Sequence, residues 1–135
     1  MRLSREPAVL VTVVATKGSV PRGPGTWMVV FAQGELGTIG GGHLEFQALA
    51  HARLILSGQP VPNQLSQVLG PSLGQCCGGA VDLSFEPVNA ADLPRLRAQW
   101  VPQRSPLALF GGGHVGKALV QTLAPLPFAV RWIDS

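Results

Sequence analysis

The chain contains no tyrosine, only two cysteines and few charged residues, which make up 13% of its 135 residues. Apolar residues reach 46%, so the chain has enough apolar material for a core and is not a disordered segment. The net charge of +3 is spread thinly, and no basic stripe carries interleaved aromatic residues. We therefore expect no nucleic-acid groove.

We also expect neither a membrane span nor a secretory leader. No uninterrupted apolar run approaches the ~18 residues that are typical of a membrane span. Residues 1–7 carry charges and have no apolar stretch of the kind that a signal peptide needs. The two cysteines are the adjacent pair Cys76 and Cys77, which fits a reducing compartment. These absences predict a cytoplasmic protein without a membrane association.

The first part of the chain has the pattern of a mixed α/β domain. The expected strands are rich in Val and Thr or alternate in polarity, and they cover residues 8–16, 26–32, 35–39, 64–69 and 80–88. Helical spacing of apolar residues predicts a helix over 43–56 and a short one capped by Asn89 or Asp92. Loops rich in Gly or Pro cover 17–25 and 70–79.

A different pattern begins near the end of the chain, where a strand, a helix and a second strand are expected over residues 107–110, 114–123 and 128–133. Gly111, Gly113 and Gly116 form G-x-G-x-x-G at the start of this helix, and Asp134 follows 134 − 111 = 23 positions after Gly111. This pattern predicts the first βαβ unit of a Rossmann-like domain, with a phosphate-bearing cofactor over the glycines and the acid on a ribose hydroxyl. The same glycines would also allow close packing with nothing bound, and both interpretations stay open.

The sequence Gly-Gly-Gly-His occurs at residues 111–114 and also earlier, at 40–43. Consecutive glycines let the backbone turn sharply, and the N–H groups of the helix that follows favour an anion. Glu45 in the first turn would complement the helix dipole, but it would oppose an anionic ligand. This segment therefore either contacts a phosphate or only forms the start of the helix. The candidate phosphate contacts are Gly40, Gly41, Gly42 and His43.

Two further loops carry candidate ligand groups. Arg22 follows a Gly- and Pro-rich turn and suits a bidentate grip on phosphate, although a solvated surface arginine is the alternative. Cys76 and Cys77 are adjacent, and Cα atoms ~3.8 Å apart are too close for an ordinary disulfide. Their spacing does not match a zinc site either. Three roles stay open for the two cysteines in this glycine-rich loop. They form a reactive thiolate that contacts a metal or carries sulfur, they form a thiol redox pair, or they are small buried side chains.

These elements together resemble the xanthine dehydrogenase accessory proteins (XdhC/CoxI). The resemblance rests on residues 11–22, 37–45 and 73–79, in this order. Residues 110–116 and 132–135 are similar to the start of that family's C-terminal Rossmann domain. The family's Rossmann domain continues past its second strand. We therefore expect a domain that is truncated at this point or completed by another chain.

The resemblance implies a maturation factor, not an enzyme, that binds the molybdenum cofactor (molybdopterin), a pterin dithiolene with a terminal phosphate. It implies that the cofactor is protected while a cysteine desulfurase adds its terminal sulfur, and that it is then inserted into xanthine dehydrogenase. Cys76 or Cys77 would contact the molybdenum or its sulfur. The implied cofactor contacts are Gln75, Cys76, Cys77, Gly78, Arg22, Gly40, Gly41, Gly42 and His43.

The predicted organisation is an XdhC/CoxI-like N-terminal domain over 1–100, a linker over 101–106 and an incomplete Rossmann-like βαβ unit over 107–135. Expected partners are xanthine dehydrogenase and a cysteine desulfurase, and a homodimer is a candidate. Two alternatives stay open, which are a fragment of a nucleotide-dependent oxidoreductase and a thiol redox module. An NAD(P) site is hard to complete here, because a dinucleotide site needs two βαβαβ halves.

Overall fold

The computed structural model describes residues 2–70, 78–100 and 104–134. The chain divides into two compact units, Met1–Pro94 and Arg95–Ser135, which we call the N-terminal and C-terminal units. The division falls inside α2 (Leu93–Trp100), whereas the predicted domain boundary lies at the end of that helix.

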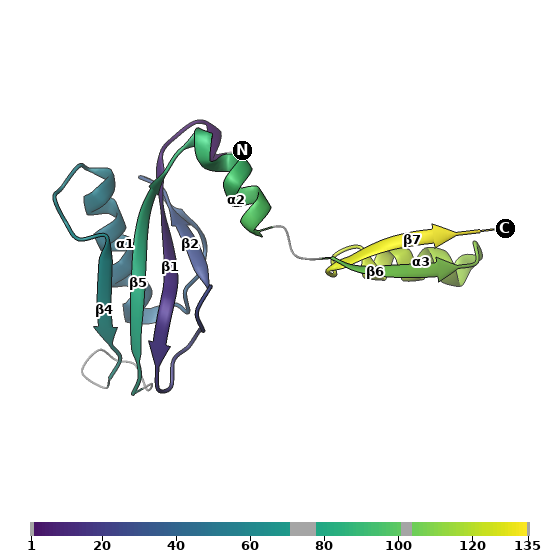
Figure 1. Ribbon diagram of the computed structural model, residues 1–135, viewed down its shortest axis with the longest axis horizontal. Helices are drawn as coiled ribbons and strands as arrows, with labels where there is room; N and C mark the ends of the chain where they lie inside the picture. Colours follow the sequence, from purple (N-terminus) through teal and green to yellow (C-terminus); the bar gives the residue numbers. More distant parts are fainter. Residues whose placement is uncertain (1, 71–77, 101–103, 135) are drawn as a thin grey trace. The chain divides into compact units, whose positions relative to one another are not determined.

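The N-terminal unit is built on a five-stranded sheet in the order β3-β2-β1-β5-β4, in which every neighbouring pair is antiparallel (Figure 1). Its strands are β1 (Ala8–Lys17), β2 (Trp27–Val30), β3 (Glu35–Gly37), β4 (Gln64–Val68) and β5 (Ala80–Val88). All five predicted strands are present. The central strand β1 is rich in Val, whose branched side chains pack well on a pleated surface.

Three of these strands, β2, β3 and β4, are shorter than the sequence predicts, and β3 shows a physical reason for the difference. The predicted strand over 35–39 ends at Gly37, where the backbone has φ 85°. The next residues leave the strand ladder, because the Ile39 N–H and the Thr38 hydroxyl donate to the carboxylate of Glu45. A side-chain acceptor has therefore taken the place of a strand partner.

The helix α1 (Gly42–Leu56) packs against the sheet and contributes to the core of the unit. Leu44, Ala48 and Ala52 are buried at helical spacing. They meet an inward row of strand residues that includes Val9, Val11, Val13, Met28, Val30, Val81, Leu83 and Phe85. The helix ends as predicted at Ser57 and Gly58, where the Gly58 N–H donates to Ile55.

The remaining elements of this part of the chain are short. The 3-10 helices η1 (Arg2–Ser4) and η3 (Ala90–Asp92) flank the first and last strands of the unit. Asn89 caps η3, since its side chain accepts from Ala91 while its own N–H donates to the Asp92 carboxylate. The two predicted cap residues therefore act together.

The C-terminal unit contains a β–α–β element, which is made of β6 (Ser105–Phe110), α3 (His114–Leu123) and β7 (Phe128–Ile133) (Figure 1). The strands are parallel, with Leu107 opposite Val130. This confirms the predicted mixed α/β class with a final βαβ unit. The first strand begins at Ser105, whose N–H donates to Pro127 at 2.9 Å, so the last two residues of the predicted linker belong to the strand. Among the described residues, no helix has the length and apolar character needed to span a membrane.

Candidate functional site

Three loops of the N-terminal unit leave the sheet at the same end. The strand register pairs Lys17 with Ala80, Val68 with Ala80, and Met28 with Gly37. The end of β1 and the start of β5 are therefore level with one another, and β3 runs toward the same end but stops earlier, because Met28 also pairs with Val11. We call this end of the sheet the three-loop end. It comprises the residues that follow or precede those strands, which are 18–22, 38–42 and 78–79.

The first contact at the three-loop end joins the loop after β1 to the two glycines before β5. A Cβ atom on Gly79 would lie 2.3 Å from the Ser19 carbonyl oxygen and 2.6 Å from that of Lys17. A Cβ atom on Gly18 would lie 3.2 Å from the Gly79 Cα. Backbone therefore packs directly on backbone, and only glycine fits at position 79.

The second contact joins the loop after β1 to the first triple glycine. A Cβ atom on Gly40 would lie 2.8 Å from Cγ of Pro21 and 3.5 Å from Cγ of Arg22. Gly40 also has φ 125°, which L side chains rarely adopt. The structure thus brings the loop that carries Arg22 between the glycines at 40–42 and those at 78–79.

The anion-binding capacity of the first triple glycine is taken up by the protein itself. The Glu45 carboxylate accepts hydrogen bonds from the Thr38 hydroxyl at 2.5 Å, from the Ile39 N–H at 3.1 Å and from the Gly41 N–H at 3.0 Å. The Gly40 N–H donates to the Thr38 hydroxyl oxygen at 3.1 Å. The backbone donors of Ile39 and Gly41 are therefore occupied by an internal carboxylate, and that of Gly40 by a hydroxyl group.

These contacts change the acidity of Glu45. Partial burial raises the pKa of its carboxyl group, while hydrogen bonds from Thr38, Gly41 and Ile39 lower it by more, so the pKa lies below its ordinary value of 4.5. The group is ionised at neutral pH. Its charge meets the positive end of the helix dipole, as the sequence predicts, but it also repels an anionic ligand from this loop.

The other predicted contacts on this side have different surroundings. Gly42 begins α1, and His43 is half-buried with its ring centroid 6.4 Å from that of Phe46. Arg22 is exposed, and its side chain has no hydrogen bond or ion pair within residues 2–70, 78–100 and 104–134. Arg22 is therefore the available cation at the three-loop end, together with Lys17 at the end of β1.

The predicted thiol site falls in a part of the chain that is not described. Gln75, Cys76 and Cys77 lie outside the described residues, and only Gly78 can be placed, exposed and with open space around its Cα. Among the described residues, no group of three His, Cys, Asp or Glu side chains is positioned to hold a metal ion. The contact between the cysteines and a cofactor stays a prediction.

The second triple glycine forms a compact turn at the start of α3. A Cβ atom on Gly116 would lie 2.5 Å from the Gly111 carbonyl oxygen, so this glycine allows the helix to pack closely on the strand. The Gly111 carbonyl also accepts from the Trp132 indole N–H at 2.8 Å. Gly113 is the N-cap of α3 and has open space around it.

Asp134 lies against this same turn. A Cβ atom on Gly112 would be only 1.8 Å from Oδ2 of Asp134, so the carboxylate occupies the space that a side chain at position 112 would need. The predicted pair of glycine turn and acid is therefore brought together in space. The glycines have a packing role whether or not a ligand binds.

Comparison with known proteins identifies the first half of the chain. The model of the XdhC and CoxI family matches residues 1–66. This segment, just under half of the chain, is thus similar to the XdhC and CoxI family. This confirms the predicted resemblance for the stretches 11–22 and 37–45, which lie inside the match, while the stretch 73–79 lies outside it.

Two relatives extend the comparison beyond the XdhC and CoxI segment. Uncharacterized protein YqeB of Escherichia coli (strain K12) is 29% identical over 132 residues, which cover 95% of this chain and 22% of YqeB. A Bacillus halodurans protein whose crystal structure is described as a xanthine dehydrogenase matches with a TM-score of 0.73 and 17% identity. The match covers 95% of this chain and 58% of that chain, and it shows a common fold. The chain thus spans little over half of the solved structure and about a fifth of YqeB.

Within the XdhC and CoxI segment, one functional candidate is missing from the sequence-based list. Glu45 holds the loop of the first triple glycine, whereas the sequence predicts that it complements the helix dipole and opposes an anionic ligand. The signal for it was present in the sequence, because an acid in the first turn after three glycines can reach the free N–H groups before the helix.

Proposed function

We propose that this chain is a xanthine dehydrogenase maturation factor that binds the molybdenum cofactor at the three-loop end. The observation that carries the proposal is the packing of the Ser19–Arg22 loop against Gly79 on one side and Gly40 on the other. The loop that ends in the exposed Arg22 thus contacts Gly79 through the backbone of Ser19. The match of residues 1–66 to the XdhC and CoxI family supports the same assignment, as does the fold shared with the Bacillus halodurans protein that is described as a xanthine dehydrogenase.

The donor set fits the anionic end of that cofactor in part. Arg22 and Lys17 are cations at the edge of the sheet and suit a terminal phosphate. The N–H groups of Ile39 and Gly41 do not fit it, because they already bind Glu45. We therefore assign the phosphate contact to the arginine loop, and we assign His43 to the rim of the site.

In this proposal the cysteine loop provides the contact to the metal end of the cofactor. Cys76 or Cys77 would supply a thiolate, a soft ligand that suits a sulfur-bearing molybdenum centre. The bound group supplies the molybdenum chemistry, and the chain binds, orients and shields it without a catalytic residue of its own. A cysteine desulfurase and xanthine dehydrogenase would be successive partners in the cytoplasm, and a homodimer remains part of the proposal.

The proposal is tested by cofactor retention. Purified chain is incubated with molybdenum cofactor, separated by gel filtration, and measured for molybdenum and pterin per chain. We expect Arg22→Gln to weaken retention by about tenfold, in line with the loss of one charge-assisted contact. Cys76→Ala or Cys77→Ala should lower the molybdenum that is retained. Arg5→Gln, which removes an exposed arginine elsewhere in the same unit, is the matched control. If the wild type and all variants retain equal amounts of molybdenum and pterin, the proposed cofactor site at the three-loop end is wrong.

A second candidate function is nucleotide binding by the C-terminal unit. The approach of the Asp134 carboxylate to Gly112 favours it, because an acid beside the glycine turn is the arrangement that holds a ribose. Titration with NADH and NADPH separates the two candidates. Binding that is lost in Asp134→Ala, without molybdenum retention by the wild type, would support the oxidoreductase fragment. Disulfide exchange that depends on both cysteines, without either ligand, would support the thiol redox module.

A further inference from the structure

The first triple glycine has an unusual backbone. Gly40, Gly41 and Gly42 have φ values of 125°, 76° and 64°, a left-handed run that residues with side chains rarely adopt. Glycine also loses more backbone freedom on folding than any other residue, so three in a row need interactions that select one conformation. Two side chains near the start of α1 supply such interactions.

These side chains accept from three successive backbone N–H groups before the helix. The Glu45 carboxylate accepts from Ile39 at 3.1 Å and from Gly41 at 3.0 Å. The Thr38 hydroxyl oxygen accepts from Gly40 at 3.1 Å, and its proton is donated to Glu45 at 2.5 Å. The two side chains therefore form one network, and removal of either leaves a backbone donor of the turn without its acceptor.

The turn that this network fixes supports the loop that carries Arg22. A Cβ atom on Gly40 would lie 2.8 Å from Cγ of Pro21 and 3.5 Å from Cγ of Arg22, so the Gly40 backbone packs against both side chains. The proline ring restricts the backbone just before the arginine. A shift of Gly40 therefore changes the support of the arginine stem.

Arg22 depends on this packing for its order. Across the described part of the chain, its side chain has no hydrogen bond or ion pair that would hold the guanidinium group. A long side chain loses rotamer freedom when it binds a ligand, and a stem that is already ordered reduces this cost. The contact with Gly40 is thus the means by which residues remote from the guanidinium group influence it.

We propose that Glu45 and Thr38 are positioning residues for Arg22, and that they act through the packing of Gly40 on Pro21 to strengthen the binding of an anionic phosphate group. The proposal rests on the proposed function for the identity of the ligand. It adds a dependence of the arginine on a carboxylate that has the same charge sign as the ligand.

Charge and position predict opposite effects for Glu45→Gln. Loss of the negative charge alone would strengthen the binding of an anion, whereas loss of the turn conformation would weaken it. Glu45 is half-buried and its carboxylate accepts from three donors, so solvent and these donors screen its repulsion of a ligand. We therefore expect the effect of position to exceed that of charge.

The Thr38 hydroxyl allows the two effects to be separated, because it can be removed without a change in charge. Thr38→Val releases the Gly40 N–H and one donor to Glu45, whereas Thr38→Ser keeps the hydroxyl. Retention of molybdenum cofactor by the full chain, measured over a range of cofactor concentrations, gives the affinity. NMR relaxation of the Arg22 Nε–H group gives the order of that side chain without a ligand.

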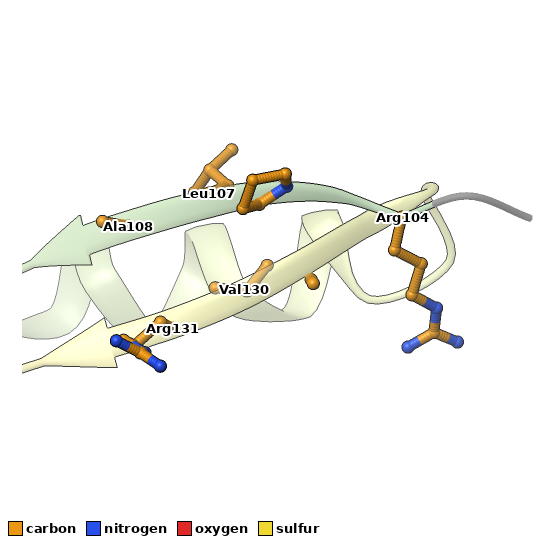
Figure 2. A pocket seen from close by; sticks show the side chains of 7 residues that line it. Arg104, Leu107, Ala108, Val130 and Arg131 are labelled. Atoms are coloured by element: carbon orange, nitrogen blue, oxygen red, sulfur yellow. The ribbon is translucent and has the colours of Figure 1, made fainter.

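Two further variants are controls. His51→Phe removes the contact of Nε2 with the Pro62 carbonyl oxygen, further along α1, and tests whether a general loss of stability has the same effect. Arg131 lies on β7 in the C-terminal unit (Figure 2), so Arg131→Gln removes the same charge as Arg22→Gln from outside the three-loop end. Both controls should retain the cofactor as the wild type does.

We expect Thr38→Val and Glu45→Gln to weaken retention by about three- to tenfold, the cost of ordering one arginine side chain on binding. Both should lower the order parameter of the Arg22 Nε–H group, and Thr38→Ser should equal the wild type. In the Arg22→Gln background, Thr38→Val should cause no further loss, because the side chain that it positions is gone.

Stronger retention by Glu45→Gln, with no change in Thr38→Val, would show that Glu45 acts through its charge and would overturn the proposal. An unchanged order parameter of Arg22 in both variants, or a loss in Thr38→Val that persists in the Arg22→Gln background, would also overturn it. If the wild type retains no cofactor while Thr38→Val lowers the Arg22 order parameter, the proposed function is wrong and the positioning of Arg22 is supported.

Discussion

The carboxylate of Glu45 accepts a hydrogen bond from the backbone N–H of Gly41 at 3.0 Å, immediately before α1 begins. It makes the same type of bond to Ile39, so one side chain satisfies two donors that a glycine-rich helix start would otherwise offer to a ligand. The first triple glycine is thus closed by an internal anion. The loop is held in the shape that packs Gly40 on Pro21.

The first prediction concerns the pH dependence of this interaction. Because the pKa of Glu45 is lowered in the folded state, the ionised carboxylate stabilises the fold fully above its unfolded pKa of about 4.5. That stabilisation is lost as the pH falls through the lower pKa of the folded state. Glu45→Gln should lower the free energy of unfolding by about 1 kcal/mol at pH 7, since the site is open enough for solvent to screen it.

Urea unfolding of the wild type and of Glu45→Gln between pH 3 and pH 7 measures this effect. The difference between the two proteins should shrink toward acid pH. Glu35→Gln is the control, because Glu35 is an exposed acid with only a 3.8 Å contact to Arg53. A difference that stays constant over the whole pH range would show that the Glu45 charge does not hold the loop.

The second prediction concerns His51 on α1. The sequence shows no partner for this side chain, but its Nε2 lies 2.6 Å from the Pro62 carbonyl oxygen, and its ring centroid lies 4.5 Å from that of Phe85. Because a carbonyl only accepts, Nε2 carries the proton. His51→Phe keeps the ring contact and removes the donor, so it should cost about 1 kcal/mol of unfolding free energy. His51→Ala also removes the ring contact and should cost more, as measured by thermal denaturation. Equal losses in the two variants would show that the ring contact with Phe85 contributes nothing.

Residues near in sequence were predicted better than residues brought together by the fold. The strand β7 has the bounds expected from its sequence, because Pro127 and Asp134 flank an apolar run. The helix α1 also matches to within one residue, since its buried positions follow helical spacing. These features depend on local pattern alone.

The contacts of the site could not be read in the same way. The acceptor role of Glu45 depends on the loop at 38–41 turning back over the helix start, and the packing of Gly79 on Ser19 joins residues sixty positions apart. The bulge between Val13 and Ala15 is likewise a property of the pairing with β5. Sequence pattern indicated which loops are special, but not which backbone groups each one uses.

The third prediction tests the packing role of the second triple glycine. In Gly116→Ala, the added methyl group would lie 2.5 Å from the Gly111 carbonyl oxygen, so α3 must move away from β6. Gly113→Ala adds the same group where the space is open. We expect Gly116→Ala to destabilise the C-terminal unit by about 1–3 kcal/mol and Gly113→Ala by no more than about 1 kcal/mol, the loss for a glycine N-cap. Amide hydrogen exchange in α3 and β7 measures the difference, and equal protection in both variants would contradict the close packing.

The last prediction concerns the two glycines before β5. Gly78 and Gly79 are adjacent, yet a Cβ atom at position 79 would overlap the backbone of Ser19 and Lys17, whereas position 78 has open space within 4 Å. Gly79→Ala must therefore separate the loop after β1 from β5, and it should cost about 2–3 kcal/mol because backbone cannot yield as a side-chain end does.

Gly78→Ala has the opposite expected sign. No steric conflict opposes it in the folded state, and alanine restricts the unfolded chain, so the unfolding free energy should stay unchanged or rise by up to about 1 kcal/mol. Urea denaturation of the pair gives the comparison. If the three-loop end binds the cofactor, Gly79→Ala should also lower molybdenum retention under conditions where the variant is folded, because it displaces the loop that carries Arg22. A folded Gly79→Ala variant with normal retention would separate the packing of these loops from ligand binding.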